Sequence, residues 1–210
     1  QIRDAVNMAR DAGFDNLSLD LIFGLPGQPM GDWETSLRAA LHLEPDHLSL
    51  YALTIEEGTP LARRVSLGRV PPTDPELQAD QYQLAEDLLE AAGFRHYEIS
   101  NWARPGYECR HNMTYWRNEP YLGLGPGAHS YIGGYRFSTV RSPGDYIRAM
   151  VRAAARPHPG PLPQGVGIPA SSPIAEIEAV CPEADLFDTL TQGLRLVEGL
   201  DLKTVGRRHG

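Results

Sequence analysis

Apolar residues recur at helical spacing in three stretches of the first hundred residues, and a short alternating or apolar run follows each stretch. Helices are expected over residues 2–12, between Asp32 and Pro45, and between Asp74 and Gly93. Strands are expected over residues 16–23, 47–53 and 95–100. The chain therefore begins with a regular alternation of helices and strands.

The residues at two of the expected helix starts suit those positions. Asp32 is expected to be an N-cap, because a short carboxylate can accept hydrogen bonds from the first free backbone N–H groups of a helix. Asp74 and Pro75 occupy the positions of an N-cap and a first helical residue. G-L-P-G-Q at residues 24–28 predicts a turn that either is a plain connection or borders a nucleoside. It lacks the Gly-Lys-Ser/Thr ending of a phosphate-binding loop.

Alternating helices and strands predict an α/β fold with parallel strands joined by right-handed crossovers. In such folds a ligand lies beyond the carboxyl ends of the strands. Those ends are expected at residues 20–28, 53–57 and 98–101. All three carry polar groups or turns, so this edge of the sheet is the predicted position of a site.

The pattern changes after about residue 102, where aromatic residues and glycines gather. The sequence predicts an isolated strand over residues 135–139 and helices over residues 143–155 and 184–197. The predicted regions are an α/β part at 1–104, a segment at 105–155 with the aromatic and glycine motifs, a linker rich in proline and glycine at 156–183, and a final segment with a helix at 184–210.

Residues 110–131 join a histidine to aromatic residues and to closely spaced glycines. His111 precedes Tyr115 and Trp116, and glycines follow at 123, 125 and 127. The aromatic rings need apolar cover, while glycines permit positive φ and the close approach of a ligand. The pattern predicts a flat, partly apolar ligand beside one histidine, although tight turns and aromatic core residues would give the same pattern.

Three further polar residues are candidates for a site. Asp20 lies within an apolar strand, so its carboxylate is expected to bond either to the protein or to a hydroxyl or ammonium group of a ligand. His129, inside the glycine-rich loop, is expected either to contact a cofactor or to stabilise a turn. Glu98 stands near the third strand end without a second carboxylate, so no acid–base pair is predicted there.

The composition of the chain argues against several classes of binding partner. The net charge of the 210 residues is -8 with no block of like charges, which argues against a nucleic-acid partner. No apolar run approaches the roughly 20 residues of a membrane span, and no signal peptide is expected. Cys109 and Cys181 are the only cysteines, too few for a cluster or a structural zinc site. A reduced, cytoplasmic setting is expected.

Several motifs, taken in order, resemble one family. They are D-L-I-F-G-L-P-G-Q, P-D-H-L-S-L-Y-A-L, Y-E-I-S-N-W-A, R-H-N-M-T-Y-W and Y-L-G-L-G-P-G-A-H-S. The chain is similar to the radical S-adenosylmethionine family related to oxygen-independent coproporphyrinogen III oxidase. Within it, the chain resembles the heme-chaperone branch with its His-Asn-x-x-Tyr-Trp motif. The resemblance covers residues 1–150 and resumes at residues 193–200.

The resemblance implies the second half of a partial (β/α) radical-SAM barrel followed by a smaller α+β C-terminal region. It implies S-adenosylmethionine and a [4Fe–4S] cluster as cofactors of the full-length protein, with heme as cargo. Asp20, Thr54, Ala128 and His129 match positions that border S-adenosylmethionine in the family. His111 matches the motif histidine implicated in heme binding, and imidazole is a suitable axial ligand for heme iron.

The sequence departs from the family at the cluster. The C-x-x-x-C-x-x-C loop that binds the cluster is absent, and the resemblance places this loop upstream of Gln1. The chain is therefore expected to be a fragment that lacks the cluster-binding part and that generates no radicals by itself. No catalytic residue and no cluster ligand is predicted within it.

Three functions remain open from the sequence. The first is a heme chaperone that passes heme to an acceptor protein. The second is an oxygen-independent coproporphyrinogen III oxidase, which would act by oxidative decarboxylation in porphyrin biosynthesis. The third is an inactive binding remnant, in which Asp20 and His111 are merely structural.

Overall fold

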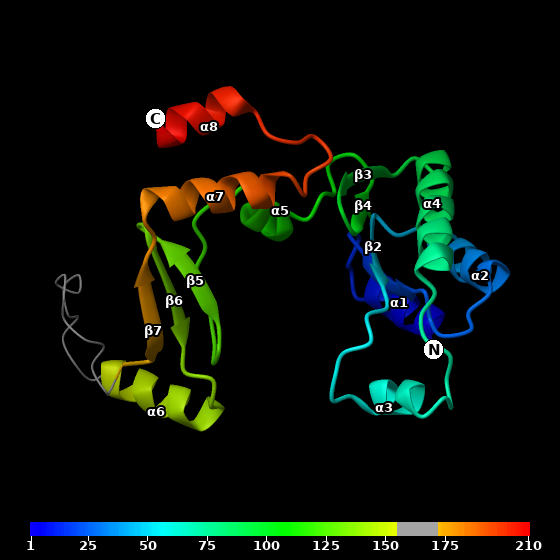
Figure 1. Ribbon diagram of the computed structural model, residues 1–210, viewed down its shortest axis with the longest axis horizontal. Helices are drawn as coiled ribbons and strands as arrows, with labels where there is room; N and C mark the ends of the chain where they lie inside the picture. The colour runs from blue at the N-terminus through cyan, green and yellow to red at the C-terminus, as the bar shows by residue number, and fades with distance from the viewer. Residues whose placement is uncertain (155–171) are drawn as a thin grey trace. The chain divides into compact units, whose positions relative to one another are not determined.

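The computed structural model describes residues 1–154 and 172–210, which form two compact units (Figure 1). Unit 1 comprises residues 1–110 and 196–198, and unit 2 comprises residues 111–195 and 199–210. Among the described residues, no helix is long and apolar enough to cross a membrane. The two units are described in turn.

Unit 1 contains most of the elements that the sequence predicts. In chain order, all elements of unit 1 are α1 (Ile2–Asp11), β1 (Ser18–Phe23), α2 (Met30–Leu41), β2 (His47–Ala52), α3 (Pro60–Ser66), α4 (Pro75–Ala91), β3 (Arg95–Glu98) and β4 (Asn101–Ala103). The predicted helices and strands before residue 100 are confirmed. Helix α3 lies in a segment without a predicted element, because seven residues are too few to show a helical period.

The four strands of unit 1 form a sheet in the order β1-β2-β4-β3. β1 and β2 are parallel, as predicted, but β4 pairs antiparallel with both β2 and β3. The chain turns after Glu98, and the three residues of β4 then insert between β2 and β3. The prediction of parallel neighbours is therefore wrong for β3. A three-residue strand is too short to give an alternating pattern.

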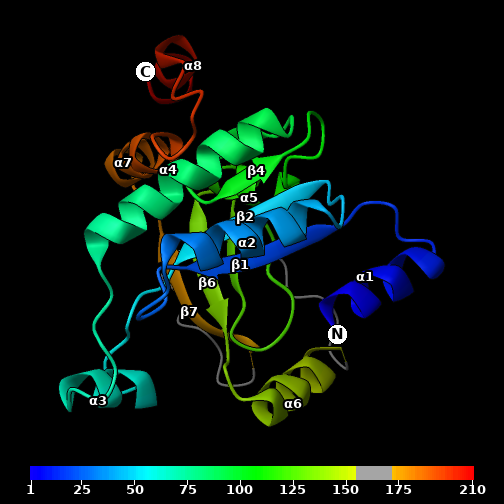
Figure 2. The same ribbon diagram turned by 90° about the vertical axis from the view of Figure 1, so that its right-hand side faces the viewer.

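Helices α2 and α4 cover one face of this sheet (Figure 2). Trp33 and Leu37 of α2 and Leu89 of α4 are fully buried against strand residues such as Leu48 and Trp102. The side chains at alternate strand positions point to the opposite face, on which neither helix packs. That helix-free face carries polar residues, which are described below.

The two predicted caps have different outcomes. Asp74 is the N-cap of α4, where its carboxylate accepts hydrogen bonds from the backbone N–H groups of Glu76 and Leu77 at 3.0 and 3.2 Å. The prediction for Asp32 is wrong, because α2 begins earlier, with Pro29 as its N-cap. Asp32 lies instead in the first turn, where a negative charge still suits the helix dipole.

Unit 2 is built on an antiparallel sheet with the order β5-β6-β7. Its elements are α5 (Arg110–Trp116), whose first residue closes unit 1, β5 (His129–Ile132), β6 (Tyr135–Thr139), α6 (Pro143–Ala154), β7 (Ile174–Ala179), α7 (Pro182–Gly193) and α8 (Leu202–His209). The strand predicted at 135–139 is confirmed as β6. It is not isolated, however, because it is the central strand of the sheet.

The predicted linker at residues 156–183 is only partly described. Residues 155–171 lie outside the described part of the chain. Within the rest, the linker prediction is wrong, because Ile174–Ala179 form β7 and α7 begins at Pro182. The alternating I-A-E-I-E-A sequence of β7 is the signal that was missed. The helix predicted up to residue 197 ends at Gly193.

Position 123 requires glycine because the backbone of His129 lies very close to it. A Cβ atom at this position would overlap the backbone carbonyl oxygen of His129, and the Gly123 N–H group donates to Ser130 Oγ at 3.0 Å. We expect Gly123→Ala to destabilise unit 2 by about 1–3 kcal/mol, because the backbone must shift. Urea unfolding would measure this. Gly31→Ala is the control, since a Cβ atom there meets open space within α2. Equal stability of the two variants would contradict the expectation.

Candidate functional site

Helix α5 carries the His-Asn-x-x-Tyr-Trp motif on only seven residues. A helix of this length is unstable alone, so its neighbours must hold it. Asn118 follows the helix with φ 49° and is buried. Its N–H group donates to the carbonyl of Tyr115 at 3.0 Å, and the N–H group of Glu119 donates to the carbonyl of Thr114 at 2.9 Å. These bonds end the helix.

The exposed His111 side chain bonds to Tyr115, one turn later on the same helix. His111 Nε2 and the Tyr115 hydroxyl are 3.0 Å apart, and the two rings meet edge to face at 4.8 Å. Tyr115 in turn contacts Tyr121 with ring centroids 4.6 Å apart. Only Nε2 of the imidazole has a partner within the described residues, so Nδ1 is open to a ligand.

The carboxylate of Asp185, on α7, connects the end of α5 to the rest of unit 2. Its Oδ1 accepts hydrogen bonds from Asn118 Nδ2 and from the Tyr131 hydroxyl, each at 2.7 Å. Arg208 of α8 lies 3.3 Å from the same oxygen and also donates to the carbonyl of Asn118 at 2.9 Å. Asp185 therefore links α5, β5, α7 and α8.

The hydrogen bonds of Asp185 control its charge. Burial is the largest influence and acts to raise the pKa of this carboxyl, but the bond from Tyr131, the charge of Arg208 and the bond from Asn118 together hold the pKa below its usual value. The carboxylate is thus ionised at neutral pH. A further contact holds α5, because the guanidinium of Arg195 lies 4.4 Å from the centre of the Trp116 ring.

Ala128 and His129 lie at the start of β5. The N–H group of Ala128 donates to Thr139 Oγ1 at 3.0 Å, and its carbonyl accepts from the Thr139 N–H group at 2.9 Å. His129 pairs with Ser138 of β6 and exposes its side chain. Ala128 therefore has a structural role in the β5–β6 pair, while the imidazole of His129 is accessible.

Asp20 and Thr54 belong to unit 1. Asp20 lies in β1 on the helix-free face, and Thr54 lies two residues beyond the end of β2. Both side chains are exposed. The Asp20 carboxylate is open to solvent, so the expectation that it bonds to a ligand stays a prediction. The predicted site residues thus fall into both units, with Asp20 and Thr54 in the first and His111, Ala128 and His129 in the second.

A row of polar side chains crosses the helix-free face at one register. Asp20 is opposite Ser49, Ser49 is opposite Asn101, and Asn101 is opposite Glu98. Glu98 and Asn101 are only 1% and 3% exposed. Asn101 Nδ2 donates to Glu98 Oε1, and the Ser100 N–H group lies 3.4 Å from Glu98 Oε2. The sequence pointed to Glu98 but missed Ser49 and the side chain of Asn101, because only the register of β4 brings them together.

A second polar group on this face is fully paired. His47 Nδ1 lies 2.8 Å from Ser18 Oγ, and its Nε2 lies 2.7 Å from the Tyr97 hydroxyl. Burial lowers the pKa of His47, although Asp20 and Glu108 act in the opposite direction. Burial also raises the pKa of Tyr97. His47 is therefore a neutral, buried histidine whose two ring nitrogens are both paired.

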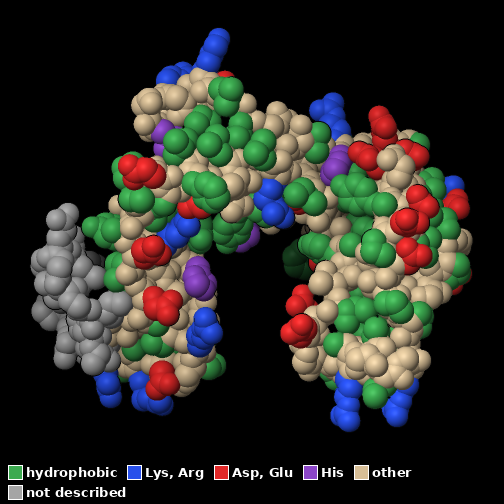
Figure 3. Space-filling model, in the orientation of Figure 1, with side chains coloured by type: hydrophobic (Ala, Val, Ile, Leu, Met, Phe, Trp, Pro, Cys, Tyr) green, Lys and Arg blue, Asp and Glu red, His purple; other side chains and the backbone are tan. Residues whose placement is uncertain are grey.

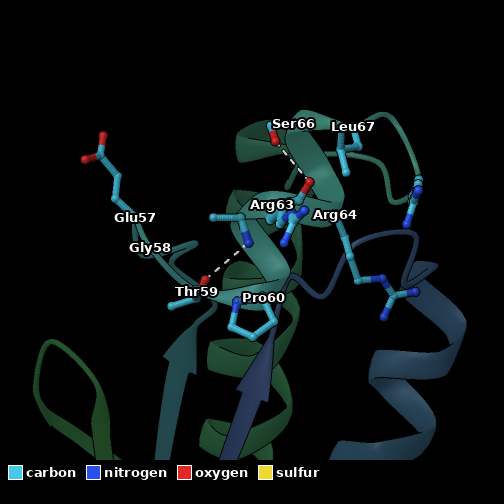
Figure 4. Close-up of a pocket in the computed structure, with 10 residues that line it drawn as sticks. Glu57, Gly58, Thr59, Pro60, Arg63, Arg64, Ser66 and Leu67 are labelled. Atoms are coloured by element: carbon cyan, nitrogen blue, oxygen red, sulfur yellow. Dashed lines mark hydrogen bonds between the residues drawn. The ribbon is translucent and has the colours of Figure 1, made fainter.

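An open pocket of about 940 Å³ is formed by residues 57–69, around α3 (Figure 4). Thr59 caps this helix by accepting a hydrogen bond from the Ala62 N–H group at 3.2 Å. Arg63 and Arg64 lie in its last turn, where positive charge suits the helix dipole. Basic side chains are visible at the surface of this segment in Figure 3. The pocket contains none of the predicted site residues.

The residues that the structure describes do not fit an iron–sulfur cluster. Over residues 1–154 and 172–210, no group of three or more His, Cys, Asp or Glu side chains could hold a metal ion. Cys109 is partly buried in unit 1, whereas Cys181 is exposed in unit 2. The helix-free face, by contrast, offers hydrogen-bond acceptors that suit the hydroxyl and amino groups of S-adenosylmethionine.

No family model matches the chain. Among curated proteins, it is 41% identical to the heme chaperone HemW of Synechocystis over 199 residues, which are 95% of the chain and 45% of that protein. It is 39% identical to the HemW of Mycobacterium tuberculosis H37Rv over 194 residues, 92% of the chain and 45% of that protein. It is also 50% identical to the bovine mitochondrial radical S-adenosyl methionine domain-containing protein 1, over 54% of the chain and 26% of that protein.

The fold matches that of a solved structure, the coproporphyrinogen III oxidase HemN from Escherichia coli. The TM-score is 0.71 at 20% sequence identity, over 99% of the chain and 46% of HemN. This likeness confirms a mixed α/β fold, and within the described residues the strands form two open sheets rather than a closed barrel. The chain spans about half the length of the curated relatives that it matches. By sequence similarity over most of its length, the chain is a homologue of the proteins named heme chaperone HemW, and its fold is similar to that of HemN.

Proposed function

We propose that this chain supplies the heme-binding part of a heme chaperone, a protein that passes heme to an acceptor protein. The observation that carries the proposal is the exposed His111 on α5. The similarity to HemW covers 95% of this chain. The surrounding Tyr115 and Tyr121 rings offer apolar surface to a flat macrocycle. Transfer to an acceptor suits a ligand that is held at the surface.

The hydrogen bond between His111 and Tyr115 indicates which nitrogen would bind iron. A histidine ligand coordinates through one nitrogen while the other donates its N–H to a fixed partner. Nε2–H donation to the Tyr115 hydroxyl leaves the Nδ1 lone pair for heme iron. Coordination through Nε2 would require Tyr115 to move away.

The cofactors of the whole protein form part of the same proposal. S-adenosylmethionine would border Asp20 and Thr54 of unit 1, whose strands β1 and β2 correspond to the second half of a partial (β/α) barrel. When bound, it would supply the precursor of a 5′-deoxyadenosyl radical. The [4Fe–4S] cluster would be held by a part of the full-length protein outside this sequence. A cytoplasmic setting completes the proposal.

A heme titration of the protein, followed by the Soret band, tests the main proposal. We expect saturable binding of one heme per chain. Absorbance that rises without saturation would overturn the proposal and favour a binding remnant. The likeness to HemN concerns the fold alone, so we do not propose coproporphyrinogen oxidation for this chain.

Tyr115→Phe separates the two modes of iron coordination. If Nδ1 binds the iron, the substitution removes the hydrogen bond that fixes the ring, and heme affinity falls about 2- to 10-fold. If Nε2 binds, the substitution frees that nitrogen and affinity rises. We expect the fall, measured as the heme Kd at neutral pH. Tyr135→Phe, an exposed tyrosine on β6, serves as the control and should leave the Kd unchanged.

A further inference from the structure

The side-chain oxygen of Asn101 receives no hydrogen bond from the described residues, and the bond that its side-chain nitrogen donates explains why. Asn101 Nδ2 donates to Glu98 Oε1. With the amide reversed, two oxygens would face each other, so this hydrogen bond fixes the orientation of the side chain. Oδ1 is then buried without a partner in the described part of the chain. An unsatisfied buried acceptor costs about 1–3 kcal/mol, so native proteins seldom leave one empty.

The neighbouring polar group on the same face, around His47, leaves no such acceptor without a hydrogen bond. Both ring nitrogens of His47 are paired, with Ser18 and Tyr97, and the Tyr97 hydroxyl also accepts from the Cys109 N–H group at 3.2 Å. Three side-chain atoms are buried and unpaired within residues 1–154 and 172–210, and the other two are indole N–H groups. Asn101 Oδ1 is thus the one acceptor among them.

The side chains around Asn101 indicate which kind of molecule would donate a hydrogen bond to its Oδ1. It shares a register row with Asp20, Ser49 and Glu98, and this row spans three strand spacings, or about 14 Å. Carboxyl groups at both ends disfavour an anionic ligand. Beside the row, Ile22 and Tyr51 face each other at the next register on this face and are 52% and 43% exposed. They offer an apolar surface to a flat ring.

We infer that Asn101 is a ligand-binding residue of the helix-free face. Its Oδ1 accepts a hydrogen bond from a hydroxyl or ammonium group of a small, donor-rich molecule such as an amino-bearing nucleoside. Glu98 is a positioning residue, because it orients the Asn101 amide without needing to touch the ligand. Asp20 lies at the exposed end of the same row, where it would accept a second donor.

Calorimetric titration of the protein with S-adenosylmethionine, adenosine and methionine tests this inference. The choice of probes rests on the proposed function. We expect Asn101→Leu, which keeps the size but removes the acceptor, to weaken S-adenosylmethionine binding about 10-fold. A loss shared by adenosine identifies a donor on the nucleoside, either a ribose hydroxyl or the adenine amino group, and a loss shared by methionine identifies the ammonium group. Ser18→Ala is the control, because its hydroxyl on the same face is already paired with His47.

A second variant covers the case in which Asn101→Leu fails to fold by circular dichroism. Asn101→Ala also removes the acceptor and introduces no bulky apolar side chain, so the same weakening is expected. Equal affinities in all folded variants would overturn the inference, and so would a wild-type protein that binds none of the three probes. Heme titration is a separate measurement, so either result leaves the heme proposal to its own test.

Discussion

Heme binding should fall by well over about 100-fold when His111 is replaced by alanine. Loss of an outer-shell partner of a metal ligand costs roughly 10- to 100-fold in affinity, and loss of the ligand itself costs more. His111 is exposed on α5 with Nδ1 open, so its removal leaves heme only the apolar contacts of Tyr115 and Tyr121. The Soret band of any remaining complex should also shift, since the axial ligand is gone. Heme titration of both proteins measures each effect.

His42→Ala is the matched control for this experiment. His42 is also exposed, but it lies at the end of α2 in unit 1, outside the motif. Its replacement should leave both the Kd and the Soret band unchanged. If His111→Ala binds heme as tightly as wild type, with the same spectrum, His111 is not the ligand. Equal losses in the two histidine variants would indicate non-specific binding through imidazoles.

Asp185→Ala should lower the free energy of unfolding of unit 2 by about 2–4 kcal/mol. The substitution removes the acceptor shared by Asn118 and Tyr131, and a hydrogen bond to a charged group contributes about 1.5–3 kcal/mol. It also leaves Arg208 without its carboxylate partner. Chemical denaturation measures the loss, and hydrogen exchange should show faster opening of α5, because Asn118 holds its end.

Asp188 provides a control on the same helix. Its side chain is 20% exposed, as is that of Asp185, and it pairs at 2.7 Å with Arg136, which is 40% exposed. Because that pair is near the surface, Asp188→Ala should cost at most about 1 kcal/mol. Similar losses in the two variants would show that Asp185 matters only as a charge on α7 and does not specifically support α5.

The contribution of Asp185 should also depend on pH. The folded-state pKa of this carboxyl lies below its unfolded value of about 3.9. Its contribution is therefore fully present above the unfolded pKa and is lost as the pH falls through the folded pKa. The difference in the free energy of unfolding between wild type and Asp185→Ala should accordingly become smaller in acid, and the remainder reflects the hydrogen bonds that a protonated carboxyl still accepts. A difference that stays constant as the pH falls through both pKa values would contradict this assignment.

The long periodic elements of unit 1 could be predicted from the sequence, since α1, α2 and α4 each show several turns of an apolar face. Several of the elements that the sequence missed are short, although β7, with six residues, is as long as β1 and β2. Helices α3 and α5 have seven residues each and β4 has three, too few for a period to be visible. The prediction of a parallel sheet consequently failed at the point where β4 enters it.

The candidate sites show a similar division. His111 could be found because it belongs to a local motif with aromatic neighbours. The roles of Asn101 and Asp185 could not, because they depend on the register of β4 and on hydrogen bonds between residues 54 to 90 positions apart. The sequence pattern predicts that a ligand approaches Gly123, whereas the atom that approaches it is a backbone oxygen of its own unit.

The distant supports of α5 have a consequence for protein synthesis. The carbonyl of Asn118 receives its hydrogen bond from Arg208, 90 residues later in the chain. At a translation rate of about 5–20 residues per second, Asn118 is synthesised roughly 5–18 s before Arg208. During that interval the end of α5 lacks the hydrogen bond from Arg208, and the helix should be frayed. The nascent chain would thus gain its capacity to capture heme late, after α7 and α8 have emerged.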